Sequence, residues 1–293
     1  LTRGAVSVGA ADPLTDVAAA QVWGLGQVAA LELPHRWGGL VDLPPTLAER
    51  DADRLVAALG QHGERQLAIR AEGTFVRRLD RAPGTGATFV PPDGPILITG
   101  GTGALGGHVA RWLAAAGAGQ LVLTSRRGLG APGAADLLAE LTALGADATV
   151  ATCDVTDPVA LRELLAGTSW RGVVHAAGVL DDGVLESLTP ERITEVARVK
   201  LGTAGLLDEL TDGLDLTMFV LFSSVAGTVG SPGQANYAAA NAGLDALAQH
   251  RHDRGLPATS IAWGPWADGG MAGSDAVGRR LSRGGITPMD PDA

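Results

Sequence analysis

The sequence has very little of several residue types that mark common classes of protein. Its one cysteine, Cys153, cannot form an internal disulfide, which suits a reducing cytoplasm. No apolar run is long enough to span a membrane, and no basic and apolar leader stands at the beginning. The net charge of −10 argues against nucleic acid or an anionic membrane surface as a partner. We therefore expect a cytoplasmic protein that binds neither.

Apolar residues, in contrast, are plentiful at 46%, against 18% charged residues, which favours a packed core over disorder. They occur in short runs between helical patterns. In the first part of the chain we predict strands over 5–8, 39–42 and 66–70, and helices over 17–31 and 47–59. Alternating strands and helices indicate βαβ units and a parallel sheet.

A connector rich in proline and glycine, 81–94, separates this part from a second series of elements. There we predict strands over 95–99, 121–124, 148–153, 172–176, 218–223 and 258–263, with helices from about 104, over 134–144 and 158–166, twice within 189–212, and over 235–254. Apolar strands of this kind belong to a sheet covered on both faces. We therefore predict an α/β protein with two units, 1–90 and 91–293, and expect both ends of a longer chain to be missing.

A glycine-rich loop follows the strand at 95–99. Gly101, Gly103 and Gly106 match the G-x-G-x-x-G fingerprint of dinucleotide-binding folds, and the helix after it offers free N–H groups to phosphates. In a chain with 42 glycines a plain turn is the alternative, but the flanking strand and helix favour a cofactor site. We predict cofactor contacts from Gly100, Gly101, Thr102, Gly103, Ala104, Leu105 and Gly106.

The next strand, 121–124, is followed by Ser125, Arg126 and Arg127, where NAD-binding folds usually carry an acid for the ribose 2′-OH. Arginine instead matches a phosphate in charge and geometry. We therefore predict NADPH as the cofactor, with Ser125 and Arg126 as contacts; two solvated arginines on a turn are the alternative. Asp154 and Val155, after the third strand, are expected beside the adenine, with an ordinary helix N-cap as the alternative.

The only tyrosine, Tyr237, and the only lysine, Lys200, both lie in the second unit. Hydride transfer to a ketone leaves charge on the carbonyl oxygen, which a tyrosine hydroxyl can protonate if a nearby ammonium eases its ionisation. A serine hydroxyl can hold the same oxygen. Ser223 and Ser224 end an apolar strand, where open α/β sheets form their ligand crevice.

Together these motifs resemble the ketoreductase domains of modular polyketide synthases, which are complex members of the short-chain dehydrogenase/reductase superfamily. The resemblance rests on the glycine loop, His-Ala-Ala-Gly at 175–178, Phe-Ser-Ser-x-Ala-Gly at 222–227, and Tyr-x-x-x-Asn at 237–241. The superfamily usually has Tyr-x-x-x-Lys. Asn241 with Lys200 is the exchanged arrangement of the polyketide ketoreductases, so this departure sharpens the assignment.

The resemblance covers nearly the whole chain and implies its architecture. Residues 91–293 would form a Rossmann-like, doubly wound parallel sheet that binds NADPH, with its C-terminal end truncated. Residues 1–90 would be the C-terminal part of a second, truncated Rossmann-like structural subdomain, plus the connector.

The resemblance also implies catalytic roles. Tyr237 would be the general acid, and Ser224 would orient the substrate carbonyl, a position that Ser223 fits less well. Lys200 would tune the tyrosine and hold the nicotinamide ribose, and Asn241 would complete a proton relay. Further cofactor contacts are then expected from Ala176, Ala177, Gly178, Lys200 and Tyr237.

The Leu-Asp-Asp sequence at 180–182 resembles the B-type signature of this family, which implies a D-configured β-hydroxyl product. Pro232 and Asn236 agree with that type, and Val229 stands where A-type domains have tryptophan. A polar turn before a helix is the alternative for the two acids. We expect stereocontrol contacts from Leu180, Asp181, Asp182, Val229, Pro232, Gln234 and Asn236.

The implied function is the stereospecific, NADPH-dependent reduction of a β-ketoacyl thioester on an acyl carrier protein to the D-β-hydroxyacyl thioester in polyketide biosynthesis. Partners would be the acyl carrier protein and other synthase domains, and no metal is expected. A non-reducing domain that keeps the fold and a stand-alone NAD-dependent dehydrogenase are the alternatives. We interpret His175 as structural and His108 as a packing or surface residue. Trp263 and Trp266 belong to the core or close the pocket, and 269–285 resembles a lid.

Overall fold

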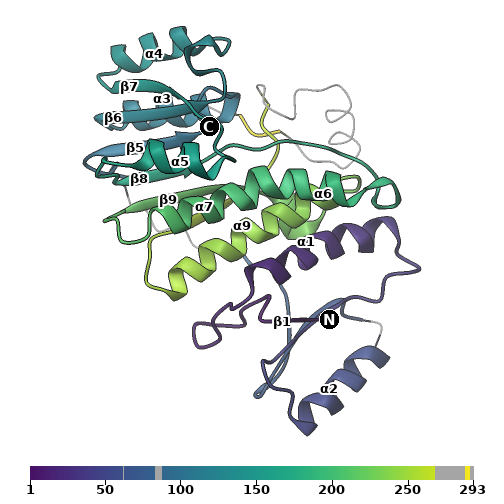
Figure 1. Cartoon of the computed structure of the whole chain (residues 1–293). Coiled ribbons are helices and arrows are strands. Elements are labelled where there is room, and N and C mark those ends of the chain that lie inside the picture. The colour runs from purple at the N-terminus through teal and green to yellow at the C-terminus, as the bar shows by residue number, and fades with distance from the viewer. Residues whose placement is uncertain (62, 83–87, 268–287, 291–293) are drawn as a thin grey trace.

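The computed structural model describes residues 1–61, 63–82, 88–267 and 288–290 (Figure 1). The first unit holds a four-stranded sheet in the order β1-β2-β3-β4, in which the first three strands are parallel and β4 is antiparallel to β3. Its strands are β1 (Thr2–Arg3), β2 (Leu40–Leu43), β3 (Gln66–Arg70) and β4 (Gly73–Val76), and its helices are α1 (Val17–Glu32) and α2 (Glu49–Gly60).

The second unit holds six parallel strands in the order β10-β9-β8-β5-β6-β7. These are β5 (Pro95–Thr99), β6 (Gln120–Ser125), β7 (Asp147–Thr152), β8 (Gly172–His175), β9 (Met218–Ser224) and β10 (Thr259–Trp263). The chain runs outward from β5 to β7 and then returns to β8 on its other side. That reversal opens a crevice at the carboxyl ends of the central strands, where such sheets bind ligands.

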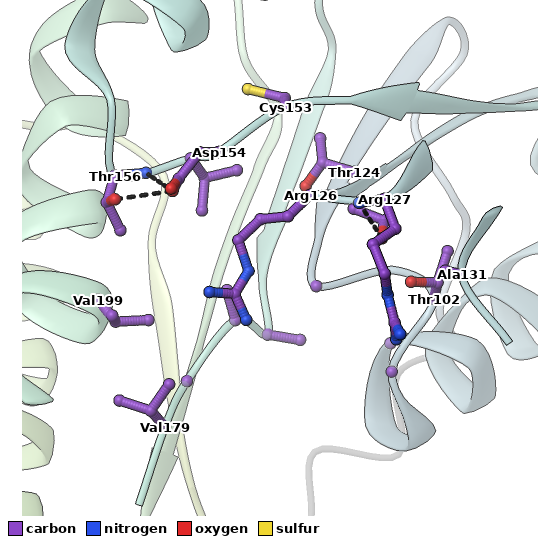
Figure 2. Close-up of a pocket in the computed structure, with 18 of the residues that line it drawn as sticks. Thr102, Thr124, Arg126, Arg127, Ala131, Cys153, Asp154, Thr156, Val179 and Val199 are labelled. Atoms are coloured by element: carbon purple, nitrogen blue, oxygen red, sulfur yellow. Dashed lines mark hydrogen bonds between the residues drawn. The ribbon is translucent and has the colours of Figure 1, made fainter. Parts of the chain in front are cut away.

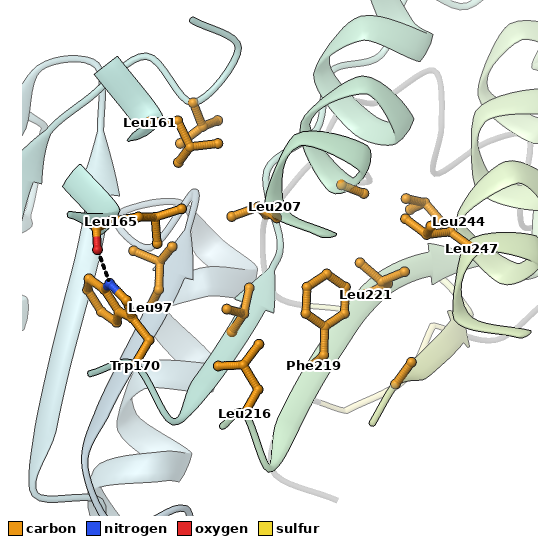
Figure 3. Packing of buried hydrophobic residues seen from close by; sticks show 14 of the residues in the cluster. Leu97, Leu161, Leu165, Trp170, Leu207, Leu216, Phe219, Leu221, Leu244 and Leu247 are labelled. Atoms are coloured by element: carbon orange, nitrogen blue, oxygen red, sulfur yellow. Dashed lines mark hydrogen bonds between the residues drawn. The ribbon is translucent and has the colours of Figure 1, made fainter. Parts of the chain in front are cut away.

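Helices cover both faces of this sheet. One apolar core joins it to α5 (Pro158–Leu165), α7 (Thr203–Leu210) and α9 (Ala235–Asp253), and Figure 3 shows Leu97, Phe219 and Leu221 of the strands packed among leucines of these helices. The opposite core joins it to α3 (Ala104–Ala115) and α4 (Ala134–Ala143). Between α5 and α7 the chain forms α6 (Pro190–Ala197) and a π-helical turn, η3 (Arg198–Gly202). The doubly wound α/β prediction is confirmed.

Helix α1 of the first unit lies along α9 of the second (Figure 1). The helices approach so closely that a Cβ on Gly24 would stand 2.2 Å from the carbonyl oxygen of Ala238. Glycine is therefore required at this crossing. Because α9 begins at Ala235, the first unit supports the same helix that carries Tyr237.

Most predicted elements are confirmed to within a residue or two, but the first strand is misplaced. The sequence predicted 5–8, whereas the strand is Thr2–Arg3 and the apolar run lies in a turn. Gly4 turns the chain with a φ of +65°, and the amide of Ala5 then donates to Asp42 Oδ1 at 3.0 Å. Antiparallel β4 and the short helix α8 (Val225–Val229) were not predicted.

Candidate active site

The glycine loop turns tightly between β5 and α3. Gly100 has a φ of +65°, a conformation that side chains disfavour. A Cβ on Gly106 would lie 2.3 Å from the carbonyl oxygen of Gly100, and one on Gly101 would lie 2.6 Å from Leu123 Cβ. Gly106 therefore lets helix α3 begin directly against the loop, and Gly101 lets the loop pack against β6. The N-terminus of the helix is left open to a ligand.

A cavity of about 810 Å³ opens in front of this loop (Figure 2). Its volume and its position at a helix N-terminus fit a dinucleotide. Predicted residues that line it are Gly100, Thr102, Gly103, Ala104, Leu105, Gly106, Ser125, Arg126, Asp154, Val155, Ala176, Ala177 and Gly178.

The sequence missed several lining residues. Thr124, Cys153, Thr156, Val179 and Val199 are adjacent in sequence to predicted contacts, so adjacency was the available signal. Ala131, Pro132, Glu195 and Arg198 carry no such signal, and Arg127 had been noted only as part of the basic turn. Gly101, Lys200 and Tyr237 were predicted as cofactor contacts but do not line this cavity.

Basic side chains approach the cavity from the end of β6, where Figure 2 shows Arg126 and Arg127. The acids that also line the cavity already have partners. Asp154 accepts from the Thr156 hydroxyl at 2.7 Å and from its amide at 3.0 Å, and these bonds lower the pKa of Asp154. Glu195 is paired with Arg198. The cavity therefore presents guanidinium groups where the sequence predicted a phosphate.

Lys200 and Tyr237 come together beside the cavity. The Lys200 Nζ lies 5.1 Å from the centre of the tyrosine ring and donates to the carbonyl oxygen of Phe222 at 3.0 Å. Lys200 belongs to η3, and π-helical turns of this kind often mark functional sites. Burial lowers the pKa of Lys200 to about 8, while the charge of Asp245 opposes that shift. The lysine is thus a buried cation within reach of the phenol.

Burial raises the pKa of Tyr237, and the neighbouring side chains of Asn241 and Ser224 oppose that shift only in part. We expected a neighbouring ammonium to lower the pKa of Tyr237. That expectation is wrong in its net direction, because the sequence does not reveal that the phenol is buried. Ser223 instead donates to the carbonyl oxygen of Asn241 at 3.2 Å. Of the two serines, Ser224 is the one that faces the phenol.

Asn241 donates from Nδ2 to the backbone carbonyl oxygen of Tyr237 at 2.8 Å, one turn earlier in α9. Its Oδ1 is buried and has no hydrogen-bond partner within the described part of the chain. Buried acceptors are normally satisfied, so this atom points to a missing donor such as a bound water or ligand group. Asn241 thus holds a buried acceptor one helical turn after Tyr237.

The KR domain family matches residues 94–268, more than half of the chain. The chain belongs to the ketoreductase (KR) domains of modular polyketide synthases. A second match, over residues 1–79, is to the Rossmann fold domain of the polyketide synthase extender module SpnB. The expected family is confirmed, and with it an oxidoreductase of the short-chain dehydrogenase/reductase type that uses a nicotinamide cofactor.

This KR domain is 55% identical over 309 residues to polyketide synthase GfsB of Streptomyces halstedii, a match that covers 100% of the chain and 6% of GfsB. It is 51% identical over 300 residues to pikromycin polyketide synthase component PikAIII of Streptomyces venezuelae, covering 100% and 19%. The chain therefore spans a small part of these relatives.

Solved ketoreductase structures superpose closely on this KR domain. One, described as A-type ketoreductases from a modular polyketide synthase, is 50% identical with a TM-score of 0.95, covering 99% of this chain and 63% of that one. The first ketoreductase of the tylosin synthase is 51% identical with a TM-score of 0.92, covering 99% and 64%. These matches confirm the Rossmann-like fold.

Four of the seven expected stereocontrol residues of this KR domain contact one another next to the start of α9. Asp182 accepts from Gln234 Nε2 at 3.1 and 3.2 Å, and Asn236 donates to the carbonyl oxygen of Asp181 at 2.8 Å. The sequence missed Arg192, which pairs with both carboxylate oxygens of Asp181 at 2.6 and 2.9 Å. Of the remaining three, Leu180 is half-buried, while Val229 and Pro232 are exposed.

The sequence left open whether two aromatic residues, Trp263 and Trp266, belong to the core or close the pocket. The rings of Trp263 and Trp266 meet edge to face with centroids 5.0 Å apart, contact Phe222 and His108, and line a second cavity of about 1590 Å³. They are not among the residues that line the cofactor cavity. His108 is confirmed as a packing residue. The expected lid, 269–285, lies outside the described residues.

His175 is fully buried at the end of β8, where its Nδ1 lies 2.7 Å from the Thr99 hydroxyl of β5. This placement fits the structural role that we expected. Across the described ranges no helix has the length and apolar character to cross a membrane. The same residues contain no cluster of three or more histidine, cysteine or acidic side chains suited to a metal.

Proposed function

We propose that this KR domain reduces a β-ketoacyl thioester, carried on an acyl carrier protein, to the D-β-hydroxyacyl thioester during polyketide biosynthesis, with NADPH as the cofactor. The observation that carries the proposal is the group formed by Tyr237, Lys200 and Ser224 beside a dinucleotide-sized cavity. Residues 91–293 would perform the reaction, and residues 1–90 would brace them.

Each of these side chains suits one part of a ketone reduction. Tyr237 donates its phenolic proton to the carbonyl oxygen, and its raised pKa keeps that proton in place until the oxygen becomes basic. The Ser224 hydroxyl donates to the same oxygen and orients the carbonyl. The cofactor, when bound, supplies the hydride that the carbonyl carbon accepts. Lys200, 5.1 Å from the ring, stabilises the phenolate that remains.

Asn241 provides a route for restoring the proton. Its unpartnered Oδ1 is an acceptor close to the phenol, at the position where a water would carry a proton back from solvent. Lys200 would also bind the nicotinamide ribose, since η3 borders the cavity through Arg198 and Val199.

The preference for NADPH is supported by the basic turn after β6. Ser125, Arg126 and Arg127 line the cavity at the position where an NAD-dependent protein would place an acid. A guanidinium there attracts a 2′-phosphate. Asp154 and Glu195 also line the cavity and are bonded to Thr156 and Arg198, although the charge of Arg126 acts on both carboxylates as well.

The D configuration is supported by the Leu-Asp-Asp segment, which contacts the turn before α9 through Asp182 and Gln234. Overall similarity does not decide this point, since a structure described as A-type superposes with a TM-score of 0.95. Product configuration depends on which face of the ketone meets a fixed hydride. A few residues around Tyr237 therefore govern it.

The test is NADPH consumption by the full-length protein with a small β-ketoacyl thioester, followed by chiral analysis of the alcohol. We expect turnover in the wild type, its loss in Tyr237→Phe, which removes only the hydroxyl, and a D product. An L product would overturn the stereochemical part alone. A folded wild type that neither binds nor oxidises NADPH would favour the non-reducing alternative.

A further inference from the structure

Glu32, the last residue of α1, reaches from the first unit into the second. Its Oε2 accepts the amide of Leu185 at 2.6 Å, and its Oε1 accepts the amide of Gly233, also at 2.6 Å. Leu185 follows the Leu-Asp-Asp segment, and Gly233 belongs to the turn that precedes α9. One carboxylate thus joins two segments that are far apart in the sequence. Short bonds from amides to a charged acceptor are among the stronger hydrogen bonds in proteins.

The same two segments also contact each other directly. The amide of Gly183 donates to the carbonyl oxygen of Gly233 at 2.8 Å, and the Asp182 carboxylate accepts from Gln234. Both contacts lie within three residues of the Glu32 bonds. The carboxylate therefore closes a small network, in which it links the two segments a further time.

Helix α1 also supports the turn before α9 at two other points. Gln27 donates from Nε2 to the carbonyl oxygen of Thr228 at 3.2 Å. Gly230 has a φ of +80°, and a Cβ there would stand 3.0 to 3.1 Å from Leu31 and Gln27. The turn consequently follows the surface of α1 along its length from 228 to 233.

We propose that Glu32 is a positioning residue for stereocontrol. It fixes the distance between the segment 180–185 and the turn 228–236, which together shape the approach of the acyl chain to Tyr237. A residue of the first unit would thereby govern which face of the ketone is reduced, although it touches neither the substrate nor the reacting atoms. The inference rests on the proposed reductase function.

The test substitutes Glu32→Gln in the full-length protein. Glutamine keeps the shape of the side chain but replaces one acceptor oxygen with an NH₂ group, so one of the two backbone amides loses its partner. We expect the ratio of major to minor alcohol isomer to fall about tenfold and KM to rise, while kcat changes by less than about threefold. Glu209→Gln, at an exposed position on α7, removes the same charge and should retain the wild-type ratio.

The outcomes separate the two proposals. Absence of turnover in the wild type would overturn the proposed function itself. A selective wild type with an unchanged isomer ratio in Glu32→Gln would overturn the role of Glu32, and so would a loss of rate at constant ratio, which indicates a merely structural residue. If Glu32→Gln fails to fold, Gln27→Met removes the bond to Thr228 instead, and an unchanged ratio there would count equally against the proposal.

Discussion

The imidazole of His175 donates from Nε2 to the backbone carbonyl oxygen of Lys200, 2.9 Å away. A carbonyl oxygen only accepts, so Nε2 carries the proton and Nδ1 accepts from the hydroxyl of Thr99. Burial and the nearby lysine lower the pKa of His175 to about 3. A neutral histidine therefore connects the central strands to the π-helical turn that positions Lys200.

This arrangement predicts a loss of stability in mild acid. Between about pH 6.5 and 3 the unfolded chain binds a proton at His175 that the folded protein does not. The free energy of unfolding therefore falls as pH decreases, by up to about 1.4 kcal/mol per pH unit. Urea unfolding at pH 7 and pH 5 measures this slope. His175→Asn should be less stable at pH 7 but less sensitive to acid. His35→Asn, at an exposed position, should keep the wild-type slope, and equal slopes in all three proteins would contradict the assignment.

The pKa of Lys200 leads to a second prediction, that kcat/KM depends on pH on the alkaline side of the profile. Its pKa of about 8 means that the ammonium is present below pH 8 and lost above it. If the charge stabilises the tyrosine phenolate, kcat/KM of the wild type should fall above pH 8. Lys200→Met should lower kcat/KM about 100-fold and abolish that fall. A Lys200→Met profile that still declines at pH 8 would assign the ionisation to another group.

Two adjacent glycines predict opposite effects in the cofactor loop. A Cβ on Gly106 would meet backbone atoms of Gly100 and Gly101 at 2.3 and 2.7 Å, and backbone cannot easily move aside. Gly107→Ala would meet the flexible end of Arg111 at 3.2 Å and Leu137 Cδ2 at an ordinary contact distance of 3.8 Å, and alanine favours the helix. We expect Gly106→Ala to raise the Kd for NADPH at least about tenfold, and Gly107→Ala to bind normally with an equal or higher Tm. Fluorescence titration and thermal unfolding measure both, and normal binding by Gly106→Ala would refute the close approach.

The features that were predictable from the sequence are those encoded locally. The loop between β5 and α3 was predicted because its glycines, the strand before it and the helix after it are contiguous in the chain. Strand 5–8 was predicted wrongly because an apolar run alone does not reveal that Gly4 turns the chain or that Asp42 binds the amide of Ala5.

Contacts between distant segments could not be predicted in this way. Glu32 and Arg192 bind residues that no local pattern associates with them, since helices and turns from different parts of the chain bring the partners together. The upward pKa shift of Tyr237 has the same origin, because it depends on burial by the surrounding fold rather than on its neighbours in sequence.

The basic turn after β6 predicts that the protein prefers NADPH to NADH. Arg126 and Arg127 line the cavity from the end of β6, and a guanidinium gains most from a doubly charged phosphate. Arg126→Ala should therefore raise KM for NADPH about tenfold or more and leave KM for NADH almost unchanged, with Arg127→Ala showing which arginine contributes more. Arg50→Ala, on the exposed surface of α2, removes an equal charge far from the cavity and controls for general electrostatics. If neither cavity variant alters the ratio of the two KM values, the 2′-phosphate does not bind at this turn, and the preference must arise from another part of the cavity.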